Sequence, residues 1–180
     1  MSVDVHATVE GVAPRAAARL LDRFEAALRR HLGSAVYGID DQSLEAAVGK
    51  ALVRRRSTVA VAESCTGGLL AERLTNVPGS SRYMRGGIIA YHDRVKMELL
   101  DVPARMLSAH GAVSAPVAKA MAQGVRAQAH ADVGISITGI AGPSGGARSK
   151  PVGLVYMGLA DGRGSRVKQF QFHGDRLAIR

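Results

Sequence analysis

A run of small polar residues, Glu63 to Thr66, followed by Gly67 and Gly68, is the stretch of this sequence best suited to chemistry. The apolar and β-branched residues from Thr58 to Ala62 predict a short buried strand before it, and the apolar spacing after Gly68 predicts a helix. A strand–turn–helix unit presents polar side chains at the carboxyl end of the strand and free backbone N–H groups at the helix start. Glycines without β-carbons let a substrate approach that main chain closely.

Taken alone, this turn is better explained by a structural role, in which Ser64 or Thr66 caps the helix and the glycines let the turn close. The lysine that should follow the second glycine of a phosphate-binding P-loop is missing. The interpretation as a functional site therefore depends on other residues that converge on the same place.

Ser64 is the candidate nucleophile, and it needs a base to take its proton. No histidine follows a strand with an obvious orienting carboxylate, and His92 and His110 are interpreted as surface or capping residues. A lysine can replace histidine where burial or nearby cations lower the lysine pKa toward neutrality. Lys96 follows an apolar strand, has two arginines nearby in the sequence, and is the candidate base; the alternative is a solvated lysine on a short helix.

Cys65 is the rival nucleophile, because a thiolate at a helix start is stabilised by the helix dipole. The alternative is a small buried residue that packs under the turn. We rank Cys65 below Ser64.

A second glycine-rich loop, Gly139 to Gly146, follows Thr138 at the end of another predicted strand. A hydroxyl and several backbone N–H groups could hold a phosphate or stabilise an oxyanion there, although such loops also simply connect strands. Asp175 and Arg176 lie at a further strand-to-helix junction, either as a phosphate clamp or as a helix cap with a surface arginine.

Composition limits the classes of function. The chain has 180 residues, enough for one domain and an appendage, and no apolar run approaches the ~20 residues of a membrane span. Its 4% aromatic content and lack of tryptophan disfavour stacking on nucleic-acid bases. The first residues show no secretory signal, and a single cysteine fits a reducing, cytoplasmic compartment. The net charge of +9 favours an anionic ligand, either a phosphate ester or nucleic acid.

Strands alternate with helices from about residue 43 onward and end in a hairpin, which predicts an α/β fold: a three-layer α/β/α sandwich with a mixed sheet ending in an antiparallel hairpin. We expect strands at 3–10, 58–62, 86–91, 132–138, 152–160 and 165–173, and helices at about 14–32, 43–55, 69–74, 93–100, 103–110 and 114–130. Residues 1–40 are expected to be a small connecting segment from a preceding domain, and residues 41–180 the main domain, its last helix cut short after Arg176.

Several motifs, in this order and spacing, resemble the CinA C-terminal domain family: Ala62–Ala71, Val77–Ser81, Gly86–Tyr91 with Lys96, His110–Ser114, Thr138–Pro143, Lys150–Gly153 and Gly174–Arg176. Each motif is weak alone, but together they are highly specific. Residues 1–40 also resemble the small domain that precedes this one in longer CinA proteins, so the chain is expected to be a fragment lacking the N-terminal domain.

The resemblance implies nicotinamide-nucleotide amidohydrolase (NMN deamidase, PncC-like) activity in pyridine-nucleotide salvage. Nicotinamide mononucleotide is hydrolysed to nicotinic acid mononucleotide and ammonia, with no cofactor and no metal. By motif, Ser64 is implied as nucleophile and Lys96 as base, with Tyr91 and Thr138 assisting. The implied substrate-binding residues are Thr66, Gly67, Gly68, Gly139, Gly142, Gly145, Gly146 and Arg176.

Two features depart from the family pattern: the shortened last helix, and Arg148 in a loop position that is often acidic in relatives. The resemblance implies a small-molecule nucleotide as partner, no membrane, and a homo-oligomer, with nucleic acid disfavoured. The alternative is a non-enzymatic module that binds nucleic acid or protein and is linked to competence or DNA damage, for which the +9 charge would serve.

Overall fold

The computed structural model describes residues 3–180, and its contacts divide the chain into two units, Met1–Ala47 and Val48–Arg180. The first unit contains helix α1, Pro14–Leu32, and a 3₁₀ turn at Gly33–Ala35. Met1 and Ser2, which belong to the expected connecting segment, lie outside the described residues.

The predicted strand over residues 3–10 is wrong. That segment has no regular secondary structure, and most of its residues are exposed. An extended segment becomes a strand only when a neighbour takes up its backbone hydrogen bonds, and within residues 3–180 no strand pairs with it. The predicted helix over residues 14–32 is confirmed, although its apolar stripe contributes no buried residue.

The second unit contains a five-stranded sheet with strand order β2–β1–β3–β4–β5. The strands are β1 Val59–Glu63, β2 Met84–Ile89, β3 Val133–Gly139, β4 Leu154–Asp161 and β5 Gly164–Gln171. Strand β1 pairs in parallel with both β2 and β3, whereas β3–β4 and β4–β5 are antiparallel. The expected mixed sheet ending in a hairpin is therefore confirmed.

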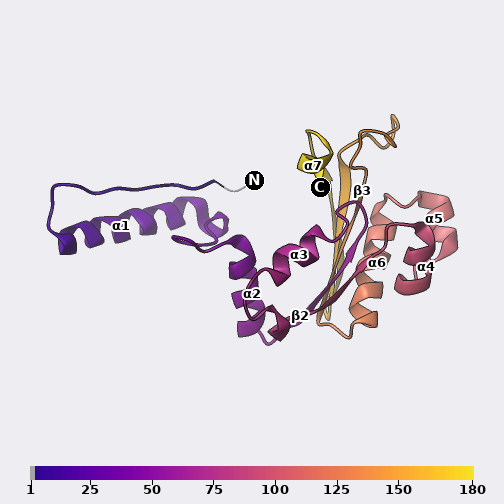
Figure 1. The fold of residues 1–180 in the computed structure, drawn as a ribbon, viewed down its shortest axis with the longest axis horizontal. Coiled ribbons are helices and arrows are strands. Elements are labelled where there is room, and N and C mark those ends of the chain that lie inside the picture. The colour runs from indigo at the N-terminus through magenta and orange to yellow at the C-terminus, as the bar shows by residue number, and fades with distance from the viewer. Residues whose placement is uncertain (1–2) are drawn as a thin grey trace. The chain divides into compact units, whose positions relative to one another are not determined.

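Helices cover both faces of the sheet and complete the expected α/β/α sandwich (Figure 1). They are α2 Leu44–Arg54, α3 Leu69–Thr75, α4 Asp93–Leu100, α5 Ala104–His110, α6 Ala115–Gln128 and α7 Arg176–Ile179. One face packs against α6, with α4 and α5 outside it, and the other face packs against α3. These are called the α6 face and the α3 face below. Among the described residues, no helix is long and apolar enough to cross a bilayer.

Each face has its own core. On the α6 face, Ala60 and Ala62 of β1 pack with Leu100 and Met121. On the α3 face, Val59 and Val61 of β1 pack with Leu74 and Tyr83. Residues from one strand thus enter the two cores alternately, as the two-residue period of a strand requires.

A side-chain staple joins the beginnings of β1 and β3. Asp132 accepts hydrogen bonds at Oδ2 from the Thr58 N–H and the Thr58 hydroxyl, both at 2.8 Å, and its own N–H donates to Thr58 Oγ1. These hydrogen bonds favour the ionised carboxylate, so they lower the pKa of Asp132 below its ordinary value of 3.8.

The staple predicts an acid-dependent loss of stability. Because the folded-state pKa of Asp132 is depressed, its contribution is present above about pH 4 and is lost as the pH falls through the folded-state value. We expect Asp132→Asn to lower the melting temperature at pH 6 and to reduce the difference in melting temperature between pH 6 and pH 3. Asp22→Asn, a change on the exposed side of α1, is the control. A pH dependence identical to that of the wild type would contradict the staple.

Candidate active site

The ends of the three parallel strands meet at one edge of the sheet. The Ser64 N–H donates to the Ile137 carbonyl at 2.9 Å, and the Ala90 N–H donates to the Glu63 carbonyl at 2.7 Å. Ser64 therefore lies between the ends of β2 and β3, with Tyr91 following one neighbour and Thr138 on the other. The convergence of loops that the topology predicts is present at this edge.

Glu63 organises the turn after β1 and was not predicted from the sequence. Its side chain is only 1% exposed, and its carboxylate accepts hydrogen bonds from the N–H groups of Gly68, Leu70 and Ala71 at 3.1, 3.0 and 2.8 Å. These are the otherwise unpaired N–H groups at the start of α3, where the helix dipole favours a negative charge. The sequence feature that could have indicated this role is an acidic residue five positions before Gly68, the second glycine of the turn that precedes α3.

Cys65 packs on the α3 face of the sheet. It belongs to a buried cluster with Ile137 and Val155, which α3 contacts through Leu70. Ser64, the preceding residue, directly follows β1 and is also buried, with 9% of its surface exposed.

The Cys65 thiol is held in its neutral form. Burial raises its pKa above the ordinary value of 9.0, and the negative charge of Glu63 adds to this effect. The nearby backbone N–H groups and the Arg180 charge act in the opposite direction but do not reverse the shift. A buried thiol with a raised pKa is a weaker nucleophile than an exposed one.

Lys96 is a buried lysine on the α6 face. Its side chain is 1% exposed, and Nζ donates to the Tyr91 carbonyl at 3.2 Å and to Asp93 Oδ1 at 3.1 Å. Leu100, one turn further along α4, packs into the α6-face core, so Lys96 points the same way. A solvated lysine is thereby excluded. His92, interpreted from the sequence as a surface or capping residue, caps α4: its ring accepts from the Arg94 N–H.

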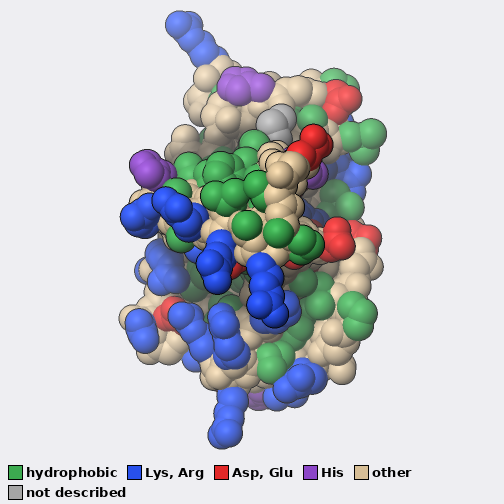
Figure 2. All heavy atoms as spheres, turned by 90° about the vertical axis from the view of Figure 1, so that its left-hand side faces the viewer, with side chains coloured by type: hydrophobic (Ala, Val, Ile, Leu, Met, Phe, Trp, Pro, Cys, Tyr) green, Lys and Arg blue, Asp and Glu red, His purple; other side chains and the backbone are tan. Residues whose placement is uncertain are grey.

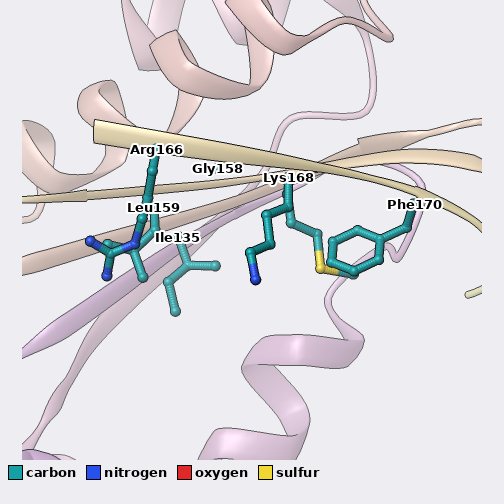
Figure 3. A pocket seen from close by; sticks show the side chains of 7 residues that line it. Ile135, Gly158, Leu159, Arg166, Lys168 and Phe170 are labelled. Atoms are coloured by element: carbon teal, nitrogen blue, oxygen red, sulfur yellow. The ribbon is translucent and has the colours of Figure 1, made fainter.

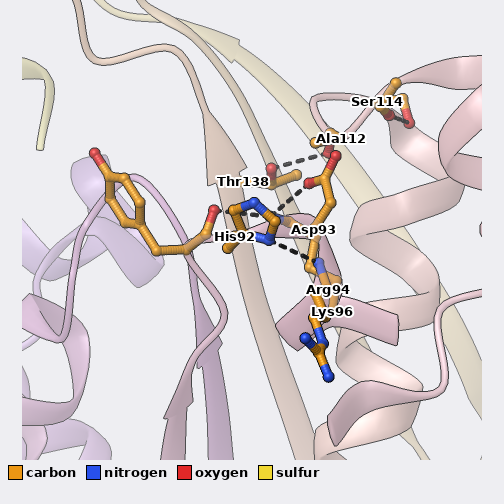
Figure 4. A network of polar contacts seen from close by, with 9 residues as sticks. His92, Asp93, Arg94, Lys96, Ala112, Ser114 and Thr138 are labelled. Carbon is orange, nitrogen blue, oxygen red and sulfur yellow. Dashed lines mark hydrogen bonds and ion pairs between the residues drawn. The ribbon is translucent and has the colours of Figure 1, made fainter. Parts of the chain in front are cut away.

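Thr138 is fully buried on the same face as Lys96. Its hydroxyl donates to the Ala112 carbonyl at 3.0 Å, in the segment that leads into α6. Ser136, two residues earlier on β3, donates to the Ala118 carbonyl of α6, which fixes the direction of this row of side chains. Figure 4 draws the Thr138–Ala112 hydrogen bond and the Lys96–Asp93 ion pair within one polar network.

Tyr91 and Arg176 interact at the outer side of the edge. Arg176 Nη2 donates to the Tyr91 hydroxyl at 2.9 Å, and Nη1 donates to the Gly142 carbonyl at 2.7 Å. Tyr91 is 58% exposed, and Arg176 is exposed as well. This arginine therefore links the loop after β2 to the glycine-rich loop and still presents donors to solvent.

The predicted substrate-binding residues of the Ser64 turn have different local roles. Gly67 and Gly68 both adopt positive φ angles, 61° and 104°, which side chains disfavour. Thr66 is buried, and within residues 3–180 its hydroxyl has no hydrogen-bond partner. Because Gly68 N–H is already bonded to Glu63, it is not a free donor for a ligand.

The glycine-rich loop is shaped by close contact with its own chain. A β-carbon at Gly139 would come within 2.8 Å of the Leu154 carbonyl oxygen, and one at Gly142 within 2.6 Å of the Val152 side chain. Gly146 is similarly tight against Val152, whereas Gly145 has more room. The glycines at 139, 142 and 146 are thus required by packing, whatever ligand the loop binds.

A surface pocket lies away from this edge. It has a volume of about 250 Å³ and is lined by Ile135, Met157, Gly158, Leu159, Arg166, Lys168 and Phe170 (Figure 3). These residues come from the middle of β3, β4 and β5, and none of the predicted site residues lines it. Among residues 3–180, no group of three His, Cys, Asp or Glu side chains could hold a metal ion.

Comparison with known proteins gives one consistent family. The family model described as CinA C-terminal domain matches residues 41–180. A CinA-like protein from Desulfotalea psychrophila is 50% identical over 167 residues, which cover 93% of this chain and 40% of that protein. The crystal structure of the competence/damage inducible protein CihA from Agrobacterium tumefaciens is similar, with a TM-score of 0.74 and 35% identity, over 76% of this chain and 84% of that one.

A CinA superfamily protein from Escherichia coli gives a TM-score of 0.73 at 32% identity, over 79% of this chain and 88% of that one. The chain spans about two fifths of the length of the curated relatives that it matches.

The role of Glu63 predicts a large loss of stability on substitution. Glu63→Ala leaves three partly buried N–H groups without their partner, so we expect the free energy of unfolding to fall by about 2–4 kcal/mol. Denaturant unfolding measures this change. Glu72→Ala, an exposed position on the same helix, is the control and should change it by less than about 0.5 kcal/mol. Equal losses in the two variants would show that the Glu63 hydrogen bonds do not stabilise the turn.

Proposed function

Because this chain belongs to the CinA family through its C-terminal domain, we propose that it hydrolyses the carboxamide of nicotinamide mononucleotide, giving nicotinic acid mononucleotide and ammonia. The observation that carries the proposal is the buried Lys96 amine at the edge of the sheet where β1 ends and Ser64 follows. Lys96 and Thr138 both belong to the α6 face there. The family resemblance supplies the reaction, and this arrangement supplies groups that can carry it out.

In the proposed first step, Ser64 Oγ attacks the carboxamide carbon while its proton passes to the unprotonated amine of Lys96. The resulting lysine ammonium then donates a proton to the departing amide nitrogen, which leaves as ammonia. A water molecule, deprotonated by the same amine, hydrolyses the acyl-serine ester and restores the hydroxyl. Asp93 and the Tyr91 carbonyl orient the Lys96 side chain during this cycle.

The substrate's phosphate is proposed to lie at the outer side of the edge, beside Arg176. This guanidinium is exposed and uses two of its nitrogens for Gly142 and Tyr91, which leaves further donors for an anion. The wider positive charge of the chain supports an anionic substrate. Figure 2 shows lysine and arginine side chains spread over one face of the molecule, with acidic side chains sparser.

Substitution of the proposed nucleophile and base tests the reaction. We expect ammonia release from nicotinamide mononucleotide, abolished by Ser64→Ala and reduced about 10²–10⁴-fold by Lys96→Ala. Cys65→Ala should retain activity, because the thiol lies on the other face. Lys119→Ala, at an exposed position on α6, is the matched lysine control.

Two results would overturn the proposal. Full activity of Ser64→Ala together with loss of activity in Cys65→Ala would assign the reaction to the thiol. Salt-dependent binding to duplex DNA without any amidase turnover would favour a nucleic-acid-binding role instead. Nicotinamide and its riboside serve as substrates without the phosphate, and we expect both to react more slowly.

A further inference from the structure

We propose that Arg180 is a positioning residue for the Ser64 turn and that α7 acts, through Arg176 and Arg180, as a clamp on the three loops of the site. This inference rests on the proposed function for its kinetic test. It concerns a residue that touches the loop carrying the nucleophile and that no motif of the sequence identified.

Arg180 reaches the Ser64 turn across a long sequence separation. Its Nη2 donates to the Thr66 carbonyl at 3.0 Å, and a β-carbon at Gly67 would lie 3.1 Å from the same nitrogen. Ile179, the preceding residue, is buried in one cluster with Cys65. Both a hydrogen bond and apolar packing therefore hold α7 against the turn.

Arg176 and Arg180 are four residues apart and project from the same side of the short helix. Arg176 holds the Tyr91 hydroxyl and the Gly142 carbonyl, while Arg180 holds the Thr66 carbonyl. The loops after β1, β2 and β3 are thus all bonded to one helical turn. No other element of the described chain makes side-chain hydrogen bonds to all three.

The bond from Arg180 fixes peptide groups adjacent to the nucleophile. The Thr66 carbonyl also accepts from the Leu69 N–H at 3.4 Å, and the Gly67 N–H donates to the Ser64 carbonyl at 3.1 Å. The Ser64 carbonyl and the Thr66 peptide are therefore parts of one small bonded unit. Since a displacement of about 1 Å at a reacting group can cost about 10²-fold in rate, a constraint on this unit matters for catalysis.

Two buried polar atoms lie at this contact. Within residues 3–180, neither Thr66 Oγ1 nor Arg180 Nε has a hydrogen-bond partner, although both atoms are buried. Unpaired buried polar groups reduce stability, and native proteins retain few of them. An apolar side chain at residue 180 would avoid one of these groups but could not hold the Thr66 carbonyl.

The kinetic test is Arg180→Ala assayed with nicotinamide mononucleotide. We expect kcat to fall about 10²-fold while KM changes by less than about 3-fold, because Arg180 acts through the turn and not on the substrate. Arg180→Lys, which keeps a charged donor, should recover part of kcat. Arg163→Ala, an exposed arginine in the β4–β5 hairpin, is the matched control and should behave as the wild type.

A second measurement does not depend on activity. Hydrogen–deuterium exchange of peptides covering residues 59–75 should be faster in Arg180→Ala than in the wild type, with exchange in α6 unchanged. If the wild type releases no ammonia, the proposed function fails, and the exchange measurement still decides whether Arg180 orders the turn. If Arg180→Ala does not fold, the same measurement is made on Arg180→Lys, where faster exchange at 59–75 supports the proposal and unchanged exchange overturns it.

Three outcomes would overturn the proposal. A rise in KM with kcat unchanged would assign Arg180 to direct substrate binding. Wild-type activity in Arg180→Ala would remove any positioning role, and so would unchanged exchange over residues 59–75.

Discussion

A buried carboxylate at the start of a helix is the interaction on which the rest of the site depends. Glu63 ends β1, and its oxygens satisfy three N–H groups at the beginning of α3. Burial of a negative charge is costly unless it is fully hydrogen-bonded, and here the helix start supplies both the donors and a favourable dipole. The direction in which the chain leaves β1 is fixed by this arrangement, and Ser64 occupies the first position after it.

The helices on the two faces of the sheet have different roles around the end of β1. On one face, α4 carries Lys96, and the segment that leads into α6 carries Ala112, the hydrogen-bond partner of Thr138. On the other face, α3 packs over Cys65 and is anchored by Glu63. The helix at the end of the chain ties the loops together from outside. The chemical result is a hydroxyl at the end of β1 and a buried amine at the same edge of the sheet.

Most of the second unit could be predicted from the sequence, because its signals are local. Hydrophobic periodicity and the N-cap residues His92 and Ser114 indicate where α4 and α6 lie. The glycine-containing turn at 161–164 indicates the hairpin. The segment at 3–10 shows the limit of such signals. Its alternating pattern is suited to a sheet, but a strand also requires a partner, and local sequence carries no information about the partner.

The candidate site could be predicted from the sequence only in part. The positions of Ser64, Tyr91 and Thr138 follow from strand ends, which sequence patterns locate well. Glu63 and Arg180 were missed because no spacing rule predicts their contacts. Glu63 bonds to N–H groups within its own turn, and Arg180 bonds to the Thr66 carbonyl, 114 residues away in the sequence.

Because side chains alternate between the two faces along β1, the face that each one occupies depends on the length of the strand rather than on which apolar residues it contains. Exchange of one apolar residue for another between Val59 and Ala62 changes only the packing, whereas an inserted or deleted residue would turn every later side chain to the opposite face. The Glu63 side chain would then point toward the α6 face and could no longer accept hydrogen bonds from the start of α3. Natural variants of this domain should therefore differ in which apolar residues occupy Val59 to Ala62. The number of residues in the strand up to Glu63 should stay the same.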